Sequence, residues 1–474
     1  MATEEDACPG GEFDEPAVTG TEYELPERVQ RIVDQHGSAL QEGLLPQKVY
    51  NDEDIYEAEL RRVFGRCWTF VGHETEIPEP GDYCQRFIGR DPFIFVRGED
   101  DEIRVLFDSC RHHGSKLCQA EQGNSSHFRC PYHGWTFKNT GDLAGIPLRH
   151  QAFQNLDPAE WSLHEAPQIE NYNGMVFASL RHDGPSFREY LGDFAWYLDI
   201  HLDVAKGGME VVGEPHRWRA ESDWKSGADN FSADSYHTGV AHRSVFEVGF
   251  GAEEISGTAG QETQTHVTHA DSGSTSLRLL DPDDEIFFGY PEEYVDTSAL
   301  NDAQTELAAA CGAATGTIFP NLSFIHLAAT NDPDKGLDGF LSFRQWQPVG
   351  PGEMEAWSWV LAPAAASDEY KKRAYDVALG TFSPSGNFEQ DDFAVWDGIA
   401  DAAGSVFAEK EGLTMNYQMG TEAASDAEIV DDWDGPGQAW STNLEEGTCR
   451  TFHGNWQKAM SGEDVGMRYP RDHL

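Results

Sequence analysis

Cationic residues are scarce in this chain of 474 residues. Lysine and arginine together number 33, against 83 aspartate and glutamate residues, and the formal net charge is -50. A nucleic-acid-binding protein needs a basic footprint, and a protein that lies on a membrane surface needs a cationic face. Neither can be built from so few cations, so we expect no binding to nucleic acid or to membranes.

Long hydrophobic runs are missing as well. No window approaches the roughly 18 to 20 apolar residues that a membrane-spanning helix requires. The first residues, Met1-Ala-Thr-Glu-Glu-Asp6, lack the basic and apolar segments of a secretion signal. These absences predict a cytoplasmic protein.

A disulfide framework is absent too, because the eight cysteines are unevenly spaced and a cytoplasmic chain does not use them as cross-links. They are Cys8, Cys67, Cys84, Cys110, Cys118, Cys130, Cys311 and Cys449. Only the stretch from Cys110 to Cys130 combines cysteine with histidine at a spacing that suggests metal chemistry.

The composition is otherwise that of a folded protein with a large core, since 39% of the residues are hydrophobic and 12% aromatic. The acidic residues are spread along the chain and therefore belong to its surface. Such a surface repels itself in dilute salt and is stabilised where counterions are plentiful. We expect adaptation to a high-salt cytoplasm and thus a halophilic source; the alternative is an ordinary acidic mesophilic enzyme.

The hydrophobic pattern predicts a helical segment followed by a β-rich module. Residues 1–40 are acidic and rich in Gly and Pro, which predicts a loose arm, and residues 41–69 contain an amphipathic helix that starts near Asn51 and ends near Gly65. Residues 70–180 form the all-β module. Its predicted strands are 83–88, 92–97 and 103–107.

Residues 181–474 predict a mixed domain, so the chain as a whole is assigned to the α+β class, with an antiparallel sheet flanked by helices. A broken helix is expected over 223–242 and a long irregular stretch over 251–315. The remaining elements are strands at 317–328, 339–347 and 353–361 and helices at 367–382 and 449–460.

Two short motifs, Cys110-Arg-His112 and Cys130-Pro-Tyr-His133, supply two thiolates and two imidazoles. Tetrahedral zinc accepts this set, and so does a [2Fe-2S] cluster in which two Cys hold one iron and two His hold the other. The cluster is favoured because each motif contributes one Cys and one His, a symmetry that a single metal does not need. A glycine after each motif would let backbone amides approach the sulfurs.

These motifs resemble the Rieske family, for which C-x-H-x17-C-x2-H is a specific signature. Respiratory Rieske proteins carry an extra cysteine in each loop and a hydroxyl residue that binds the cluster, whereas this chain has Ser115, Tyr132 and Trp135 at those positions. Fewer hydrogen bonds to the cluster imply a lower potential. A low-potential donor suits an oxygenase.

A second group of metal-ligand residues lies in the broken helix. Asp234 and His237 would share one helix face, whereas His237 and His242 lie about 140° apart on an ideal helix and converge only if it ends or bulges, for which Gly239 offers a place. Two His and one carboxylate on one face of an iron leave open positions for O2. The carboxylate must come from elsewhere, and the candidates are Glu389, Asp391 and Asp392.

From about residue 45 to 470 the chain resembles the large (α) subunits of the aromatic-ring-hydroxylating dioxygenases, especially those of the biphenyl, benzene and naphthalene group. Beyond the two metal motifs, the resemblance is carried by residues 63–68, 72–74, 81–83, 171–178 and 388–392. It implies a Rieske [2Fe-2S] domain over 70–180 and a catalytic domain over 181–474, to which 41–69 also belong.

The resemblance also implies the ligands and their neighbours. It assigns the cluster to Cys110, His112, Cys130 and His133, and a mononuclear non-haem Fe(II) to His237, His242 and Asp392, with Asp391 and Glu389 as alternatives to Asp392. In this family Asp234 bridges His133 of one subunit and His237 of the next in a trimeric ring. The implied pocket residues are Asn230, Phe231, Ser235, Thr238 and Phe388.

The function implied is a terminal oxygenase that uses O2 to convert a small aromatic substrate to a cis-dihydrodiol. A flat ring with a polar substituent fits the mixed pocket positions. Electrons would come from NAD(P)H through a reductase, a ferredoxin or both, and a small β subunit would complete an α3β3 assembly, with a bare α3 trimer as the alternative. Two other functions are a monooxygenase or demethylase with the same metals, and a non-catalytic electron carrier.

Overall fold

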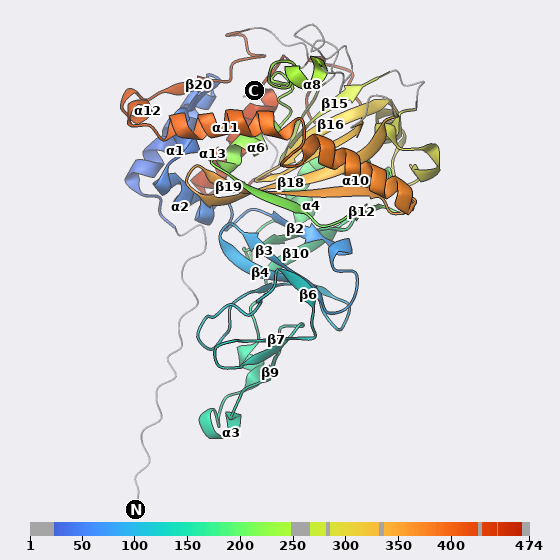
Figure 1. The fold of residues 1–474 in the computed structure, drawn as a ribbon. Helices are drawn as coiled ribbons and strands as arrows, with labels where there is room; N and C mark the ends of the chain where they lie inside the picture. Colours follow the sequence, from blue (N-terminus) through green and yellow to red (C-terminus); the bar gives the residue numbers. More distant parts are fainter. Residues whose placement is uncertain are drawn as a thin grey trace, which may run out of the picture.

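The structure, a computed structural model, describes residues 23–247, 266–280, 285–330, 336–424, 429–442 and 444–466. Figure 1 shows a β-rich part carrying strands β3 to β9 and, above it, a larger part in which a broad sheet is flanked by helices. The α+β class and the antiparallel catalytic sheet expected from the sequence are confirmed.

The β-rich part consists of three small antiparallel sheets. The first has the order β5-β4-β3-β6, the second β7-β8-β9 and the third β10-β11-β2. Their strands are β2 Thr69–His73, β3 Asp82–Ile88, β4 Asp91–Arg97, β5 Ile103–Phe107, β6 Gln122–Asn124, β7 His127–Arg129, β8 Thr136–Lys138, β9 Leu143–Gly145, β10 Gln168–Tyr172 and β11 Met175–Ser179. The three strands predicted at 83–88, 92–97 and 103–107 are confirmed as β3, β4 and β5.

The larger part is built on a nine-stranded antiparallel sheet of order β12-β19-β18-β17-β16-β15-β14-β21, with β13 also paired to β19. The strands are β12 Met209–Val211, β13 His216–Ala220, β14 His266–Ala270, β15 Gly273–Leu279, β16 Cys311–Ile318, β17 Leu322–Ala329, β18 Asp338–Gly350, β19 Glu353–Pro363 and β21 Ala439–Trp440. Short strands β1 Leu44–Pro46 and β20 Thr414–Asn416 pair separately.

Helices surround this sheet (Figure 1). They are α1 Glu27–Leu40, α2 Glu53–Arg62, α4 Phe187–Leu191, α5 Ala195–Asp203, α6 Trp224–Asn230, α7 Thr238–Ala241, α8 Arg243–Glu247, α9 Asp302–Ala310, α10 Asp368–Phe382, α11 Glu389–Ala403, α12 Val406–Glu411 and α13 Gly447–Ser461; α3, Arg149–Ala152, lies in the β-rich part. The helices predicted at 367–382 and 449–460 are confirmed as α10 and α13.

One strand prediction and one prediction of irregular structure were wrong in the middle of the chain. The run 317–328 is not one strand, because β16 ends at Ile318 and the chain turns through Pro320, which has no N–H to donate to a ladder. Residues 251–265 of the predicted irregular stretch lie outside the described residues. The part from 266 to 315 instead contains strands and helix α9. Small hydroxyl side chains there form hydrogen bonds with one another, as between Ser276 Oγ and Thr315 Oγ1 at 3.0 Å.

The loose arm predicted for residues 1–40 was also wrong over its second half. Residues 27–40 form α1, whose Val29, Val33 and His36 share one face and are buried. The His36 ring lies 4.6 Å from the Trp456 ring of α13. Packing of this face, rather than the overall composition, therefore determines the local structure.

The helix predicted from Asn51 is confirmed as α2, and its buried face includes the charged residues Glu59 and Arg62. Glu59 points into the core, where Lys225 Nζ lies 2.7 Å from its carboxylate and 2.7 Å from that of Asp223. The indole N–H groups of Trp224 and Trp456 also donate to Glu59, at 2.9 and 2.7 Å. This buried polar cluster ties α2 and α13 to the start of α6, the helix that leads into the second metal motif.

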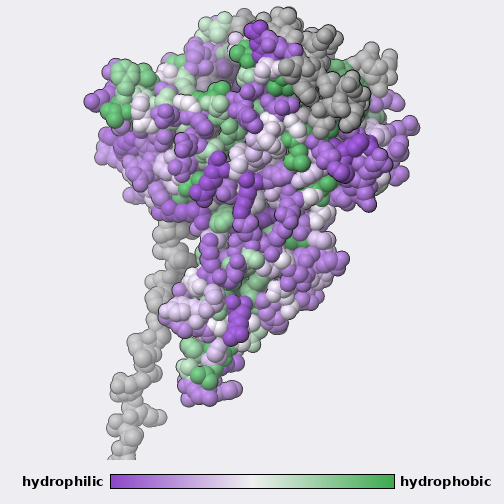
Figure 2. Space-filling view, in the orientation of Figure 1, coloured by the Kyte–Doolittle hydropathy of each residue, from purple (hydrophilic) through white to green (hydrophobic). Residues whose placement is uncertain are grey.

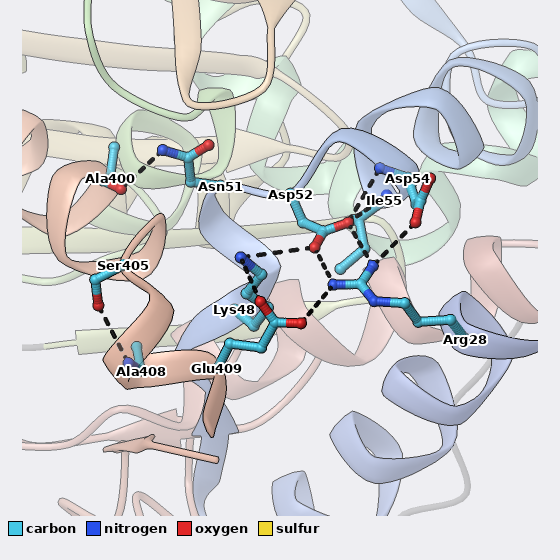
Figure 3. A network of polar contacts seen from close by, with 10 residues as sticks. All are labelled: Arg28, Lys48, Asn51, Asp52, Asp54, Ile55, Ala400, Ser405, Ala408 and Glu409. Atoms are coloured by element: carbon cyan, nitrogen blue, oxygen red, sulfur yellow. Dashed lines mark hydrogen bonds and ion pairs between the residues drawn. The ribbon is translucent and has the colours of Figure 1, made fainter. Parts of the chain in front are cut away.

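A second polar network, shown in Figure 3, joins α1, α2 and α12. Asp52 caps α2 by accepting from the amides of Asp54 and Ile55 at 3.0 and 3.2 Å, and Arg28 Nη2 lies 2.5 Å from its carboxylate. Burial alone would raise the pKa of Asp52, but the bonds from Arg28 and the Ile55 amide outweigh it and lower that pKa. Glu409 of α12 lies 3.6 Å from Arg28 Nη2 and 3.9 Å from Lys48 Nζ.

The face in Figure 2 is predominantly hydrophilic, with hydrophobic residues exposed only in scattered places. This agrees with a surface placement of the acidic residues. Within the described part of the chain, no helix has both the length and the apolarity needed to cross a membrane.

The Asp52 network makes a measurable contribution to stability. We expect Asp52→Asn to lower the free energy of unfolding by about 1–2 kcal/mol at neutral pH. Because the folded-state pKa is depressed, this contribution is present above the unfolded pKa of about 4 and is lost as the pH falls through the folded value. Denaturant unfolding between pH 3 and 7 measures this change in the free energy of unfolding.

Glu409→Gln, at a half-exposed pair, should lower the free energy of unfolding by less than about 1 kcal/mol. Equal losses in the two variants, or a loss in Asp52→Asn that does not depend on pH, would contradict this account.

Candidate metal centres

The two Cys/His loops at the tips of the small sheets have the same backbone geometry. The Cys110 amide donates to Ser115 O at 2.9 Å and the Gly114 amide to Cys110 O at 2.8 Å. The second loop repeats this pattern, with Cys130 N to Trp135 O at 2.8 Å and Gly134 N to Cys130 O at 3.1 Å. Both glycines have positive φ, near 75°, which non-glycine residues rarely adopt. The loops are thus two copies of one ligand-holding turn.

The side chains of these loops converge. Cys110 and Cys130 are each 3% exposed, and the His112 and His133 rings lie 4.6 Å apart. His112 Nδ1 is buried without a hydrogen-bond partner, as expected of a nitrogen that binds a metal. Burial would raise the pKa of Cys130, but bonds from the amides of Tyr132 and His133 outweigh it and hold that pKa below its ordinary value, which favours a thiolate.

Trp135 packs against a ligand candidate of the cluster, a contact that the sequence does not predict. It is the residue found where respiratory Rieske proteins carry a hydroxyl, and its ring stacks on His112 with centroids 4.9 Å apart and an interplanar angle of 4°. Phe153 meets the edges of both rings, 5.5 Å from Trp135 and 5.8 Å from His112. The His112 ring is therefore packed between Trp135 and Phe153.

The second motif lies where the helix predicted over 223–242 is interrupted. Helix α6 ends at Asn230, the chain turns through Ala233 with a positive φ of 74°, and α7 resumes after His237 and ends before His242. The predicted break is confirmed, but its placement at Gly239 was wrong, because Gly239 is buried inside α7. His237 and His242 stand at the two ends of this four-residue helix, and their rings lie 5.2 Å apart.

Three side chains from distant parts of the chain meet at this point. Asp392 Oδ1, in the first turn of α11, lies 3.6 Å from His237 Nε2 and 3.3 Å from His242 Nε2. One ligand atom from each of these three residues falls within 4.8 Å of the others, the one such group of three found among the described residues. Two imidazoles and a carboxylate in this arrangement could hold one divalent metal ion.

The three carboxylates proposed from the sequence occupy different places. Glu389 points away from the imidazoles and pairs with the buried Arg344. Asp391 Oδ2 lies 3.5 Å from the outer nitrogen of His242, Nδ1. Asp392 is the one of the three that faces both Nε2 atoms.

The electrostatics around His237 favour a cation. Burial alone would lower the pKa of His237, but Asp234 and Asp392 outweigh burial and raise it to about 9. Burial raises the pKa of Asp392 to about 7, while burial and the adjoining His237 lower the pKa of His242 to about 3. Two carboxylates thus flank one imidazole, so positive charge is stabilised there.

Asp234 lies on the outer side of His237. Its Oδ2 is 3.3 Å from His237 Nδ1, and its other oxygen accepts from the amides of Tyr236 and His237 at 3.1 and 3.4 Å. The Asp234 side chain is 31% exposed, and no hydrogen bond or ion pair joins it to His133 within the described residues of this single chain. The Asp234 carboxylate is therefore partly exposed at the surface, although each of its oxygens already has a contact within the chain.

Aromatic rings form one wall of the second centre. Phe388 meets the edge of His242 at 5.1 Å and stacks on Phe382 at 5.1 Å and 14°. Phe231, next to Asn230, packs on Trp346 at 5.4 Å. Asn230 Nδ2 lies 3.4 Å from His237 Nδ1, whereas Ser235 and Thr238 are half-buried on the following turn.

The sequence reasoning missed Phe382 and Arg344. Arg344 donates to Phe382 O at 2.6 Å, and its guanidinium lies 5.3 Å from the ring centres of both Phe231 and Phe382. A lone arginine within the apolar run 339–347 was a usable signal, because a cation in a buried strand requires an acidic partner.

A β domain that presents two cysteines and two histidines, joined to an antiparallel domain that presents two histidines and a carboxylate, defines a Rieske-type non-haem-iron oxygenase. The comparisons agree. Residues 67–167 match the model of the Rieske [2Fe-2S] domain, and residues 209–462 match that of the ring hydroxylating alpha subunit (catalytic domain).

Known proteins align over nearly the whole chain. The chain is 36% identical to the N,N-dimethyl phenylurea N-demethylase subunit alpha of Sphingobium sp., covering 92% of this chain and 95% of that one. It is 32% identical to the biphenyl 2,3-dioxygenase subunit alpha of Rhodococcus jostii, covering 95% of each. The structure of naphthalene 1,2-dioxygenase from Rhodococcus sp. bound to indole superposes with a TM-score of 0.87 at 37% identity, covering 92% and 99%.

The chain therefore belongs to the family of ring-hydroxylating oxygenase alpha subunits. It is an oxidoreductase, the terminal oxygenase subunit of a system with a reductase or ferredoxin, and its cofactors are a Rieske [2Fe-2S] cluster and a mononuclear non-haem iron. The zinc alternative and the electron carrier without a catalytic domain are thereby set aside.

The geometry makes different predictions for the two adjacent aspartates. We expect Asp392→Ala to lower the iron content from about three to about two per chain, with the visible spectrum of the cluster unchanged. Asp391→Ala, which removes only a contact to the outer side of His242, should keep the third iron and lose activity about 10- to 100-fold at most. Iron analysis with absorption spectroscopy tests both; an Asp392→Ala protein that keeps all its iron and turns over would overturn the assignment.

Proposed function

We propose that this subunit adds both atoms of O2 to adjacent carbons of an aromatic ring, giving a cis-dihydrodiol. The observation that carries the proposal is the convergence of His237, His242 and Asp392 beside the stacked rings of Phe388 and Phe382. A three-residue ligand set leaves positions open at a metal, and flat apolar walls suit a flat substrate. The dioxygenase subunits acting on biphenyl, chlorobenzene and benzene, all 30–32% identical to this chain, support the same reaction.

The site residues would bind the metals, orient the imidazole ligand and hold the substrate. Cys110 and Cys130 would hold one iron of the cluster, and His112 and His133 the other. When bound at His237, His242 and Asp392, the mononuclear iron supplies O2 activation with electrons from the cluster. Asn230 and Asp234 both face His237 Nδ1, so they would fix the orientation of this imidazole, while Phe231 and Phe388 would exclude water and hold the ring.

The substrate we propose is a small aromatic ring with a polar substituent. Phe231, Phe382 and Phe388 provide the apolar surface, while Asn230 and the half-buried Ser235 and Thr238 place polar groups on the adjoining turn. Arg344 is occupied by Glu389 and Phe382 O, and no arginine is left among these residues for a substrate carboxylate. An aromatic acid is therefore disfavoured.

Oxidative demethylation is the second candidate function. It is favoured by the similarity to the phenylurea N-demethylase subunit, whose name describes an aromatic substrate with a polar, methylated substituent. The same two metal centres would serve this reaction: one atom of O2 would enter the N-methyl group, which would then leave as formaldehyde with an N–H group in its place, and the other atom would be reduced to water by two electrons and two protons.

Turnover under ¹⁸O₂ separates the two reactions. The reduced protein is given benzene, biphenyl, naphthalene and an N,N-dimethyl phenylurea, and the products are analysed by mass spectrometry. We expect a diol with both oxygen atoms labelled. An unlabelled demethylated urea, together with formaldehyde that receives the single ¹⁸O atom, would support demethylation instead, and formation of neither diol nor formaldehyde by iron-replete, reduced protein would refute both.

We further propose that three copies form a ring, with a β subunit completing α3β3, in which Asp234 links His237 to His133 of the neighbouring copy. The half-exposed carboxylate and the exposed His133 suit such a contact. Oxygen atoms of one ionised carboxylate can accept from both imidazole N–H groups and fix their orientation.

The bridging role predicts the effect of Asp234→Asn. The amide cannot accept from both imidazoles as a carboxylate does, so turnover should fall about 100-fold while both iron centres stay loaded. Iron content, the spectrum of the reduced cluster and product formation are measured in parallel, with Asp183→Asn at an 80% exposed site as the control. Normal turnover of the Asp234→Asn protein would contradict the bridge.

A further inference from the structure

A group of aromatic rings extends from the mononuclear site toward the surface. Three indoles, those of Trp218 in β13, Trp346 in β18 and Trp396 in α11, surround the ring of Phe393. Their centroids lie 5.6, 6.3 and 4.8 Å from that ring, and Trp346 and Trp396 lie 5.5 Å from each other. We call the three tryptophans the indole triad.

The indole triad adjoins the mononuclear site at two points. Trp346 packs on the pocket residue Phe231 with ring centroids 5.4 Å apart. Phe393 directly follows the ligand candidate Asp392, and Trp396 lies four residues beyond Asp392 on the same buried face of α11. An oxidant formed at this site therefore has one buried indole behind the pocket wall and another one helical turn from a ligand candidate.

The triad also has a defined outer end. Trp346 and Trp396 are 0% and 3% exposed, whereas Trp218 is half-buried on its strand. The indole N–H of Trp346 donates to Ser323 Oγ at 2.8 Å inside the protein. Because solvent reaches Trp218, an oxidised indole there can release its proton to water. Loss of that proton favours oxidation at the outer end of the triad.

Cations distinguish the triad from other buried indoles. Arg86 lies 5.1 Å over the Trp357 ring and 5.9 Å over the Trp359 ring, and Lys225 lies 5.0 Å over the Trp224 ring. A positive charge at this distance opposes the removal of an electron from an indole. In the part of the chain that the structure describes, no Lys or Arg side chain lies over a ring of the triad. The triad is therefore the more easily oxidised group.

We propose that the indole triad carries oxidising equivalents from the mononuclear site to the surface when O2 is reduced there without attacking a substrate. This inference goes beyond the proposed function but rests on it, because O2 reduction at this site is the source of the oxidant. Tryptophan is among the side chains that lose an electron most readily. The triad thereby spares the ligand candidates and the pocket wall from oxidation, a side reaction that a closed site must prevent.

The electrons and protons of this route balance. Reduction of one molecule of hydrogen peroxide to two waters takes two electrons and two protons. Each electron leaves Trp346 or Trp396 and is replaced by one from Trp218, which also releases its N–H proton to the solvent. The Trp218 radical then takes a hydrogen atom from a low-molecular-weight thiol, and two of the resulting thiyl radicals join as a disulfide. Two thiols thus supply both electrons and both protons.

Hydrogen peroxide provides a direct test. Holoenzyme is treated with peroxide in the absence of an aromatic substrate, and peptide mass spectrometry maps the oxidised side chains. We expect severalfold more oxidation at Trp218 than at Trp196 and Trp433, which are half-buried indoles outside the triad. Added glutathione should lower the oxidation of Trp218 by a larger factor than that of the two reference indoles.

Substitution of the inner indoles tests the route itself. In the double variant Trp346→Phe with Trp396→Phe, oxidation at Trp218 should fall severalfold, while oxidation of Phe231 and His237 and loss of the third iron should increase. The corresponding double Tyr variant also removes both indoles but keeps oxidisable rings, so it should retain most of the oxidation at Trp218. Trp359→Phe, at a fully buried indole outside the triad, is the matched control and should behave as wild type.

Trp218→Phe tests the outer end at a half-buried position, where the substitution disturbs the core least. Oxidation should then accumulate at Trp396 and Trp346 in the holoenzyme. An unchanged oxidation of these two residues would overturn the proposal, whether or not the double variants fold.

Three further results would overturn the proposal. The first is equal oxidation of Trp218 in Asp392→Ala protein that lacks the third iron, because peroxide would then attack from the solvent. The second is equal behaviour of the double Phe and double Tyr variants, which would indicate packing alone. The third is the same loss in the Trp359→Phe control. Failure to form a diol under ¹⁸O₂ would refute the proposed function instead, since the peroxide reaction needs only the bound iron.

Discussion

The mononuclear site depends on one buried ion pair, between Arg344 of β18 and Glu389 in the first turn of α11. Both side chains are at most 3% exposed. Arg344 also donates to Phe382 O at the end of α10, and its guanidinium is enclosed between the rings of Phe382 and Phe231. One side chain from a central strand thus joins the ends of three helices. Removing either partner would leave an unpaired buried charge, at a cost of about 3–5 kcal/mol.

The Arg344–Glu389 ion pair also fixes the position of Asp392. Glu389 and Asp392 are three residues apart on α11 and share a face, so anchoring the first residue sets the position of the second. On the opposite side, the buried cluster of Glu59, Lys225 and Asp223 anchors the start of α6, the helix that ends beside His237. The ligand candidates are thus supported from both sides by buried charges, and each of these charges has a partner.

How much the sequence reveals depends on how local the determining contacts are. The two Cys/His loops lie within 24 residues of each other, and their glycines and spacing contain the information needed to recognise them. The choice of Asp392 over Glu389 depends on Arg344, which is distant in the chain, and it came only from the resemblance to a family. Strands β15 and β16 escaped notice because their buried faces carry Ser and Thr hydroxyls that bond to one another, as between Ser276 and Thr315. Helix α1 was missed because three inward residues, not its composition, determine its structure.

The way the chain enters and leaves the β-rich part has a consequence for its history. Helix α1 packs on α13, so the two ends of the described chain close one domain, and β2 pairs with β11 with Thr69 opposite Ala178. The Rieske module is therefore an insertion whose two connections emerge side by side from a continuous catalytic domain. A module attached in this way can be acquired or exchanged as a unit, because the large sheet and its helices keep their own connectivity when the insert changes.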